Sequence, residues 1–149
     1  MREEETALAG LRILIVDDND KFLKLVSSML RRLRVGQVYT APDGKYALKL
    51  LYDAGDVSPI NLIMCDLCMP HLDGLQLLRQ TRFMQPAYPF LMVTGSTDEQ
   101  TVLEAKAAGV SGFLAKPFTL EELKSKLSVV MQAMTDGGAP NTLNWIDNG

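Results

Sequence analysis

Five short runs of apolar residues alternate with longer segments in which apolar residues recur every three or four positions. The runs occupy residues 11–16, 37–40, 61–65, 89–93 and 111–115. Three of them, centred at Ile13, Ile63 and Leu91, are continuously apolar, as strands are when helices cover both faces of a parallel sheet. The pattern therefore predicts an α/β protein of three layers, built from five βα units.

The segments between the runs predict five helices. They begin near Asp20, at Asp43, at Asp73, after residues 96–99 and after residues 119–122. Asp73 can cap the third helix, Gly109 is suited to end the fourth in a left-handed conformation, and the sequence T-L-E-E at 119–122 has a capping-box pattern. The third helix has four apolar positions at which it is expected to meet the core: Leu75, Leu77, Leu78 and Phe83.

Polar residues stand where four of the apolar runs end. Asp17 and Asp18 follow the first run, Asp66 the third, Thr94 the fourth and Lys116 the fifth. Because the carboxyl ends of parallel strands share one edge of the sheet, we expect these side chains to gather there. Three carboxylates, a hydroxyl and an ammonium are the groups that hold a divalent cation and a phosphoryl group.

Four motifs follow one another along the chain: Asp17-Asp18, Asp66 with Met69-Pro70 and Asp73-Gly74, Thr94, and Lys116-Pro117-Phe118. Asp66 lies 48 residues after Asp18, Thr94 lies 28 after Asp66, and Lys116 lies 22 after Thr94. In this order the motifs resemble the receiver domain of bacterial two-component response regulators, over about residues 11–134. The resemblance implies a flavodoxin-like (βα)5 doubly wound parallel sheet with strand order 2-1-3-4-5, in a stand-alone protein similar to the chemotaxis regulators.

The resemblance also implies a role for each acidic residue. Asp66 is the phosphoacceptor, a carboxylate nucleophile that attacks the phosphorus of a phosphohistidine. Mg²⁺ is held directly by Asp18, Asp66 and the backbone carbonyl of Cys68, while Asp17 acts through water. Such a protein catalyses its own phosphorylation and dephosphorylation and is not an enzyme acting on small molecules.

Lys116 is implied to contact the phosphoryl group, after a strand end and before a cis bond to Pro117. Thr94 is implied to donate its hydroxyl to a phosphoryl oxygen and to move inward, with Phe113 as the aromatic switch residue. Since Phe113 has no hydroxyl, packing alone distinguishes its rotamers. The output face is then formed by the fourth predicted helix, the fifth strand and the fifth helix.

Two residues depart from the family's usual pattern beside the phosphoacceptor. Cys68 replaces a commoner polar residue, and Ser96 stands two positions after Thr94. His71, in the loop after Asp66, is interpreted as an exposed neutral imidazole. Cys65 and Cys68 form a Cys-x-x-Cys pair, but a zinc site needs four ligands, so we interpret Cys65 as a buried strand residue.

Composition and charge argue against two classes, nucleic-acid-binding and membrane-spanning proteins. The chain has 149 residues, 47% of them hydrophobic, with 15 basic and 18 acidic side chains and a net charge of −3. This balance gives no support to direct nucleic-acid binding. No apolar run reaches the roughly 18 residues of a membrane span, so we expect a soluble, cytoplasmic protein.

The sequence divides into an N-terminal extension (1–10), the receiver domain (11–134) and a C-terminal tail (135–149) that leaves no room for an effector domain. The tail contains Leu143, Trp145 and Ile146, and its sequence fits a disordered tail, a docking segment or a linker that has been cut short. The expected partners are a sensor histidine kinase or histidine phosphotransfer protein and a downstream protein. We expect a monomer or weak dimer.

Three other functions remain open from the residues alone. A flavodoxin-like nucleotide binder needs a glycine- and hydroxyl-rich phosphate loop, but residues 17–20 are D-D-N-D. A Mg²⁺-dependent phosphohydrolase with an aspartyl-phosphate intermediate would use the Asp18-x-Asp20 pair and leave Asp66 idle. A phosphate sink or phosphorelay receiver would be phosphorylated without an output of its own. The substitution Asp66→Asn discriminates between the phosphohydrolase and a receiver.

Overall fold

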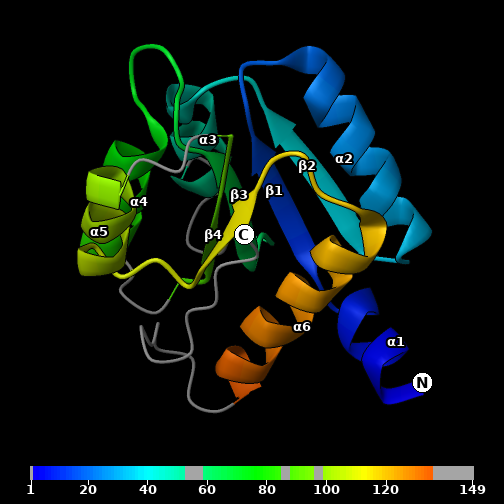
Figure 1. The fold of residues 1–149 in the computed structure, drawn as a ribbon. Coiled ribbons are helices and arrows are strands. Elements are labelled where there is room, and N and C mark those ends of the chain that lie inside the picture. The colour runs from blue at the N-terminus through cyan, green and yellow to red at the C-terminus, as the bar shows by residue number, and fades with distance from the viewer. Residues whose placement is uncertain (1, 53–58, 85–87, 96–98, 136–149) are drawn as a thin grey trace.

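The computed structural model describes residues 2–52, 59–84, 88–95 and 99–135 (Figure 1). One parallel sheet contains five strands: β1 (Arg12–Val16), β2 (Gln37–Ala41), β3 (Leu62–Asp66), β4 (Phe90–Thr94) and β5 (Gly112–Ala115). Their order is β2-β1-β3-β4-β5, and every neighbouring pair is parallel. The predicted flavodoxin-like fold and its strand order are therefore confirmed.

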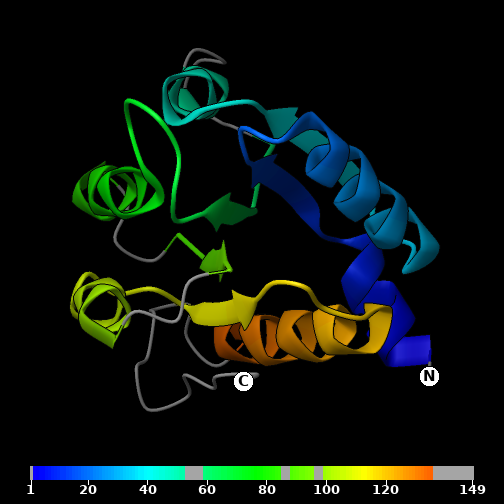
Figure 2. The ribbon, with the colours of Figure 1, turned by 45° about the horizontal axis from the view of Figure 1, so that its top comes forward.

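Helices cover both faces of the sheet, as Figure 2 shows. In the described residues they are α1 (Arg2–Ala9), α2 (Asp20–Arg32), α3 (Gly44–Tyr52), α4 (Gly74–Met84), α5 (Glu99–Ala107) and α6 (Leu120–Thr135). The last five correspond to the five predicted helices, and α1 was not predicted. No helix in the described part of the chain is long and apolar enough to cross a membrane.

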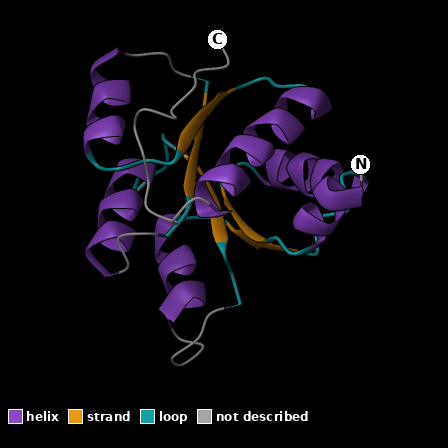
Figure 3. Ribbon diagram, turned by 90° about the horizontal axis from the view of Figure 1, so that it is seen from below, coloured by secondary structure: helices purple, strands orange, loops and turns teal. Residues whose placement is uncertain are grey.

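The core consists of two clusters, one on each face of the sheet. Ile13 and Ile15 of β1 pack with buried residues of α1, α2 and α6, while Leu14 and Val16 pack with those of α3, α4 and α5. Successive side chains of a strand point to opposite faces, so a continuously apolar strand serves both clusters. The helix layers are separated by the strands when the molecule is seen from below (Figure 3).

The predicted helix caps form. The Asp73 carboxylate accepts a hydrogen bond from the backbone N–H of Gln76 at 2.8 Å, which caps α4. The Thr119 hydroxyl accepts from the Glu122 N–H at 3.1 Å, and the Glu122 carboxylate accepts from the Thr119 N–H at 2.9 Å, which completes the capping box of α6. Gly109, after α5, has a φ of 90°.

The expectation that Phe83 meets the core is wrong, because its side chain is 90% exposed. The buried residues of α4 include Leu75, Leu77 and Leu78, as predicted, and also Thr81. An α-helix turns about 100° per residue, so Phe83 lies about 140° around the axis from Leu78 and faces solvent.

The amino ends of β4 and β5 carry a polar cluster that the sequence did not reveal; we call Arg82, Tyr88, Gly109 and Ser111 the amino-edge cluster. The Arg82 guanidinium donates to the Gly109 carbonyl from Nε at 2.9 Å and from Nη2 at 2.7 Å, and to the Tyr88 carbonyl from Nη1. Burial lowers the pKa of Arg82 to about 10. One cation thus ties the end of α4 to two loops.

Candidate functional site

Three carboxylates meet at the carboxyl ends of β1 and β3, and we call Asp17, Asp18 and Asp66 the acidic rim. One carboxylate oxygen of each lies within 4.8 Å of the other two. The fold brings them together because β1 and β3 are neighbours, Asp66 ends β3, and Asp17 and Asp18 directly follow β1. Asp17 and Asp66 are buried, whereas Asp18 is exposed.

Lys116 supplies the positive charge of the site. Its ammonium lies 2.7 Å from Oδ2 of Asp17 and 3.7 Å from Oδ2 of Asp66. The same Nζ lies 3.9 Å from the centre of the Phe22 ring, over its face. The bond from Lys116 to Pro117 is cis, as the resemblance implied. The ammonium is therefore held between two carboxylates and an aromatic ring.

The two aspartates after β1 differ in how much of their carboxylate is already engaged. Both oxygens of Asp17 have partners, since Oδ1 accepts from the Asn19 N–H at 2.8 Å and Oδ2 accepts from Lys116. Asp17 is also only 1% exposed. Asp18 faces solvent, so its oxygens are open to a ligand that enters from outside.

Burial and the neighbouring charges shift the pKa of Asp66. Burial raises the pKa of Asp66 above its ordinary value, and the charges of Asp17 and Asp18 raise it further, against the opposing effect of Lys116. The backbone N–H of Cys68 also donates to the carboxylate and lowers the pKa. The fold therefore disfavours the negative charge on Asp66 until another cation arrives.

A close approach of α4 fixes the backbone that carries Asp66. A Cβ added at Gly74 would lie 2.3 Å from the carbonyl oxygen of Asp66 and 2.9 Å from Cα of Leu67. Only glycine fits there without a shift, because real Cβ atoms do not approach other atoms so closely. The sequence analysis quoted Gly74 as part of a motif but did not give it this positioning role.

Thr94 and Phe113 are both buried, with exposed fractions of 1% and 3%. Thr94 ends β4, and its carbonyl accepts from the Lys116 N–H at 2.8 Å, which ties the residue to the strand that leads into Lys116. Phe113 belongs to the core cluster on the α3, α4 and α5 side. The Phe113 ring is therefore enclosed in the core.

The side chains of Cys65, Cys68 and His71 do not belong to the acidic rim. Both cysteines are free, with Cys65 buried and Cys68 exposed. Burial, followed by the charge of Asp66, raises the pKa of the Cys65 thiol well above its ordinary value, so this thiol stays protonated. His71 is exposed with a φ of 67°. Ser96 lies outside the described residues.

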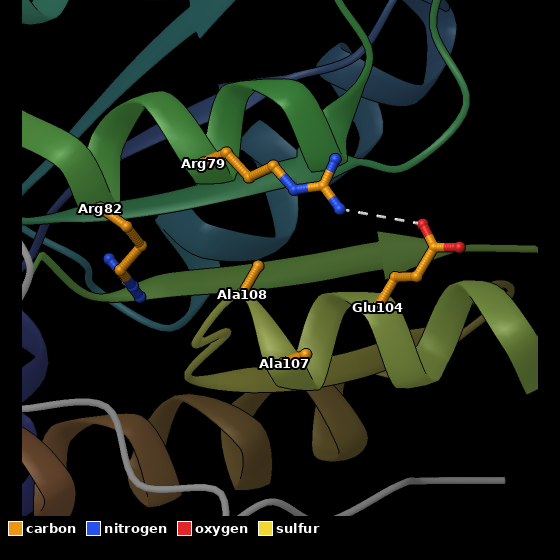
Figure 4. Close-up of a pocket in the computed structure, with 5 residues that line it drawn as sticks. All are labelled: Arg79, Arg82, Glu104, Ala107 and Ala108. Atoms are coloured by element: carbon orange, nitrogen blue, oxygen red, sulfur yellow. Dashed lines mark ion pairs between the residues drawn. The ribbon is translucent and has the colours of Figure 1, made fainter.

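Two pockets lie beside α5, and each is lined by residues of both α4 and α5. One, of about 370 Å³, lies between Arg79, Arg82, Glu104, Ala107 and Ala108, with a 4.0 Å ion pair between Arg79 and Glu104 (Figure 4). The other, of about 530 Å³, is lined by residues of the loop after Asp66 and by Thr101 and Glu104 of α5. Neither contains a residue of the acidic rim.

The acidic rim fits a hard divalent cation. Mg²⁺ prefers oxygen ligands and keeps several waters, so one or two direct carboxylates suffice. The cluster offers three carboxylates against one ammonium, and a bound cation would offset the excess negative charge. A cation bound at the rim, together with the Lys116 ammonium, would therefore neutralise the charge of a phosphoryl group from two sides.

Comparison with known proteins gives one consistent family. The sequence profile of the family described as "Response regulator receiver domain" matches residues 13–128. Chemotaxis protein CheY-3 of Vibrio cholerae is 34% identical over 127 residues, which cover 84% of this chain and 95% of the relative. Chemotaxis protein CheY of Pseudomonas aeruginosa is 33% identical over 124 residues, which cover 82% and 97%.

Solved structures agree with these relatives. The chain superposes on chemotaxis protein CheY4 of Vibrio cholerae, crystallised at low pH, with a TM-score of 0.72 and 31% identity, covering 80% of this chain and 98% of the other. A receiver domain from an HD domain-containing protein of Pseudomonas fluorescens gives a TM-score of 0.75 at 25% identity, covering 85% and 98%.

Proposed function

The chain belongs to the response regulator receiver domain family, and on that premise we propose that it is a phosphorylation-dependent switch that accepts a phosphoryl group on Asp66. One observation carries the proposal. The Asp66 carboxylate lies within 4.8 Å of two other carboxylates, which can hold a divalent cation, and 3.7 Å from an ammonium, so a bound cation and Lys116 would both face a phosphoryl group on Asp66.

The transfer follows from this arrangement. An oxygen of Asp66 attacks the phosphorus of a phosphohistidine, the new O–P bond forms as the P–N bond breaks, and the leaving imidazole takes up a proton. Lys116 moves from its partners to a phosphoryl oxygen and neutralises charge there. Asp18, Asp66 and the carbonyl of Cys68 would hold Mg²⁺, with Asp17 acting through water, and the bound ion would offset phosphoryl charge on the side away from Lys116.

The output is proposed to pass through Thr94. Its hydroxyl donates to a phosphoryl oxygen only when the residue moves inward, so the phosphoryl group selects that arrangement. The inward position of Phe113 is compatible with it, and the outward position is the alternative state. The face formed by α5, β5 and α6 would then change its affinity for a downstream protein.

We also propose a phosphoryl donor, a cellular location and domain boundaries for the protein. The phosphoryl donor is a sensor histidine kinase or a histidine phosphotransfer protein, which places the receiver in the cytoplasm. The receiver domain spans residues 11–134, with 1–10 as an extension and 135–149 as a tail. Residues 136–149 of the tail lie outside the described residues.

Incubation with a small-molecule phosphodonor and Mg²⁺ tests the proposal directly. Mass spectrometry should locate the label on Asp66 alone, through a bond that is stable to acid and labile to base. Asp66→Asn or excess chelator should abolish labelling. Asp73→Asn is the matched control, because asparagine still caps α4 and Asp73 is not in the acidic rim.

Undiminished labelling of Asp66→Asn would contradict the proposal. A label at Asp18 or Asp20 in that variant would point instead to the phosphohydrolase that the sequence left open. Labelling of Asp66 without any response in residues 94–118 would reduce the protein to a phosphate sink.

A further inference from the structure

Helix α1, which precedes the segment matched to the receiver family, is bound to α6. The Glu4 carboxylate lies 3.9 Å from the Lys124 ammonium, and its other oxygen accepts a hydrogen bond from the Ser128 hydroxyl at 3.1 Å. Leu8 is 2% exposed and belongs to the core cluster on the α2 and α6 side. Helix α1 is therefore part of the packed structure.

The same helix also fits closely against the turn after α2. A Cβ added at Gly36 would lie 2.2 Å from the carbonyl oxygen of Ala9 and 3.1 Å from that of Leu11. Backbone atoms cannot give way as a flexible side chain does, so any larger residue at position 36 would push the end of α1 away. Helix α1 thus bridges two elements, α6 and the α2–β2 turn.

A line of contacts connects α6 with the acidic rim. Lys116 lies over the face of the Phe22 ring at 3.9 Å, and the Phe22 ring meets the edge of Phe118 at a centroid distance of 6.0 Å. Phe118 stands two residues before the start of α6 and packs in the same core cluster as Leu8. The position of the Lys116 ammonium therefore bears on how the start of α6 packs.

We propose that α1 is a strap on α6 that loosens when Asp66 is phosphorylated. A phosphoryl group draws the Lys116 ammonium off the Phe22 ring, which removes the cation–π attraction that holds Phe22 under it. Phe22 and Phe118 then pack less firmly, and the α6 surface that receives Glu4 shifts. This inference rests on the proposed function and adds a second route to it, in the helix layer opposite α4 and α5.

Linkage makes the effect reciprocal. If phosphorylation weakens the docking of α1 by some factor, then the undocked protein must favour the phosphorylated form over the docked protein by that same factor. Glu4→Gln removes one exposed ion pair, so it should raise the affinity for beryllofluoride, a phosphoryl mimic, by about two- to fivefold. Glu3→Gln is the matched control, since Glu3 is exposed on the same helix and forms no ion pair with α6 among the described residues.

Amide hydrogen exchange on the full chain, with Mg²⁺ and with or without beryllofluoride, tests the strap. The mimic should speed exchange in α1 and in residues 124–128. Phe22→Leu should speed exchange in α1 without the mimic and reduce the further effect of the mimic. Phe83→Leu is the control, because this aromatic ring is 90% exposed on another helix.

The two proposals fail in different ways. If residues 66–74 do not respond to beryllofluoride, the proposed function fails and the strap fails with it. If those residues respond while α1 exchanges at an unchanged rate, only the strap is overturned. Gly36→Ala provides a check that leaves Phe22 intact: it should undock α1 and raise affinity for the mimic, and unchanged affinity in a folded Gly36→Ala protein would also overturn the strap.

Discussion

The amino and carboxyl edges of the sheet differ in how their charged side chains are paired. At the amino edge, the partly buried guanidinium of Arg82 donates to the neutral carbonyls of Tyr88 and Gly109. At the carboxyl edge, three carboxylates lie within 4.8 Å of one another beside a single ammonium. The first arrangement satisfies its polar groups within the chain, whereas the second leaves an excess of negative charge.

This difference indicates which edge of the sheet contributes to stability and which contributes to ligand binding. A partly buried cation that donates to backbone carbonyls from all three guanidinium nitrogens holds elements together without a ligand. Crowded carboxylates with a raised pKa at Asp66 oppose folding and become favourable only when a cation binds. We therefore expect substitutions at the amino edge to change the free energy of unfolding, and those at the acidic rim to change the response to ligands.

Removing Arg82 should have the largest effect on stability. Arg82→Ala deprives two carbonyl oxygens of charged donors, so the free energy of unfolding should fall by about 2–4 kcal/mol. Urea unfolding measures this loss, and Mg²⁺ binding by the folded fraction should be unchanged. Arg79→Ala is the control: its one ion pair is exposed and 4.0 Å long, so the loss should stay below about 1 kcal/mol.

Gly74→Ala should come next and acts at the acidic rim through the backbone. The added methyl meets the Asp66 carbonyl, so the start of α4 must shift at a cost of about 1–3 kcal/mol. Unlike Arg82→Ala, this variant should also slow phosphorylation of Asp66 by the small-molecule donor. A normal phosphorylation rate in a destabilised Gly74→Ala protein would contradict the proposal that changes at the acidic rim alter the response to ligands.

Mg²⁺ should stabilise the wild-type protein by a smaller amount. At a free concentration ten times the dissociation constant, binding to the folded state adds about 1.4 kcal/mol to the free energy of unfolding. Thermal unfolding with increasing Mg²⁺ should show this gain in wild type and in Arg82→Ala. Its persistence in Asp18→Asn would contradict the role given to the rim.

The smallest effect concerns pH. Because the pKa of Asp66 is raised in the fold, the folded protein holds this proton more tightly than the unfolded chain does, and stability falls as the pH rises through the raised pKa. Asp66→Asn should therefore be more stable than wild type at neutral pH without metal. The difference should vanish below the ordinary pKa of 3.8, and a less stable Asn variant at neutral pH would contradict it.

Much of the fold was readable from the sequence because its signals are local. Continuously apolar runs, the cap at Asp73 and the capping box at Thr119 each depend on neighbours within a few residues. The meeting of Asp17 and Asp66 could be predicted as well, since parallel strands share one edge. Strand order came from the resemblance and not from periodicity.

The features that escaped prediction depend on contacts between distant segments. Helix α1 has few apolar residues, and its docking is visible only through contacts with distant residues such as Gly36 and Lys124. Arg82 reads as an ordinary surface residue of a helix until Gly109 is placed beside it. Phe83 was assigned to the core on hydrophobicity alone, although its angle around α4 excludes it.

The different burial of the two cysteines has a practical consequence. Cys65 is enclosed in β3, whereas Cys68 is exposed two residues after Asp66. A thiol-directed fluorophore or spin label should therefore attach at Cys68 alone in the folded protein, without any engineered cysteine. The native chain thus provides its own single attachment point for a spectroscopic reporter beside the residue whose chemistry is in question.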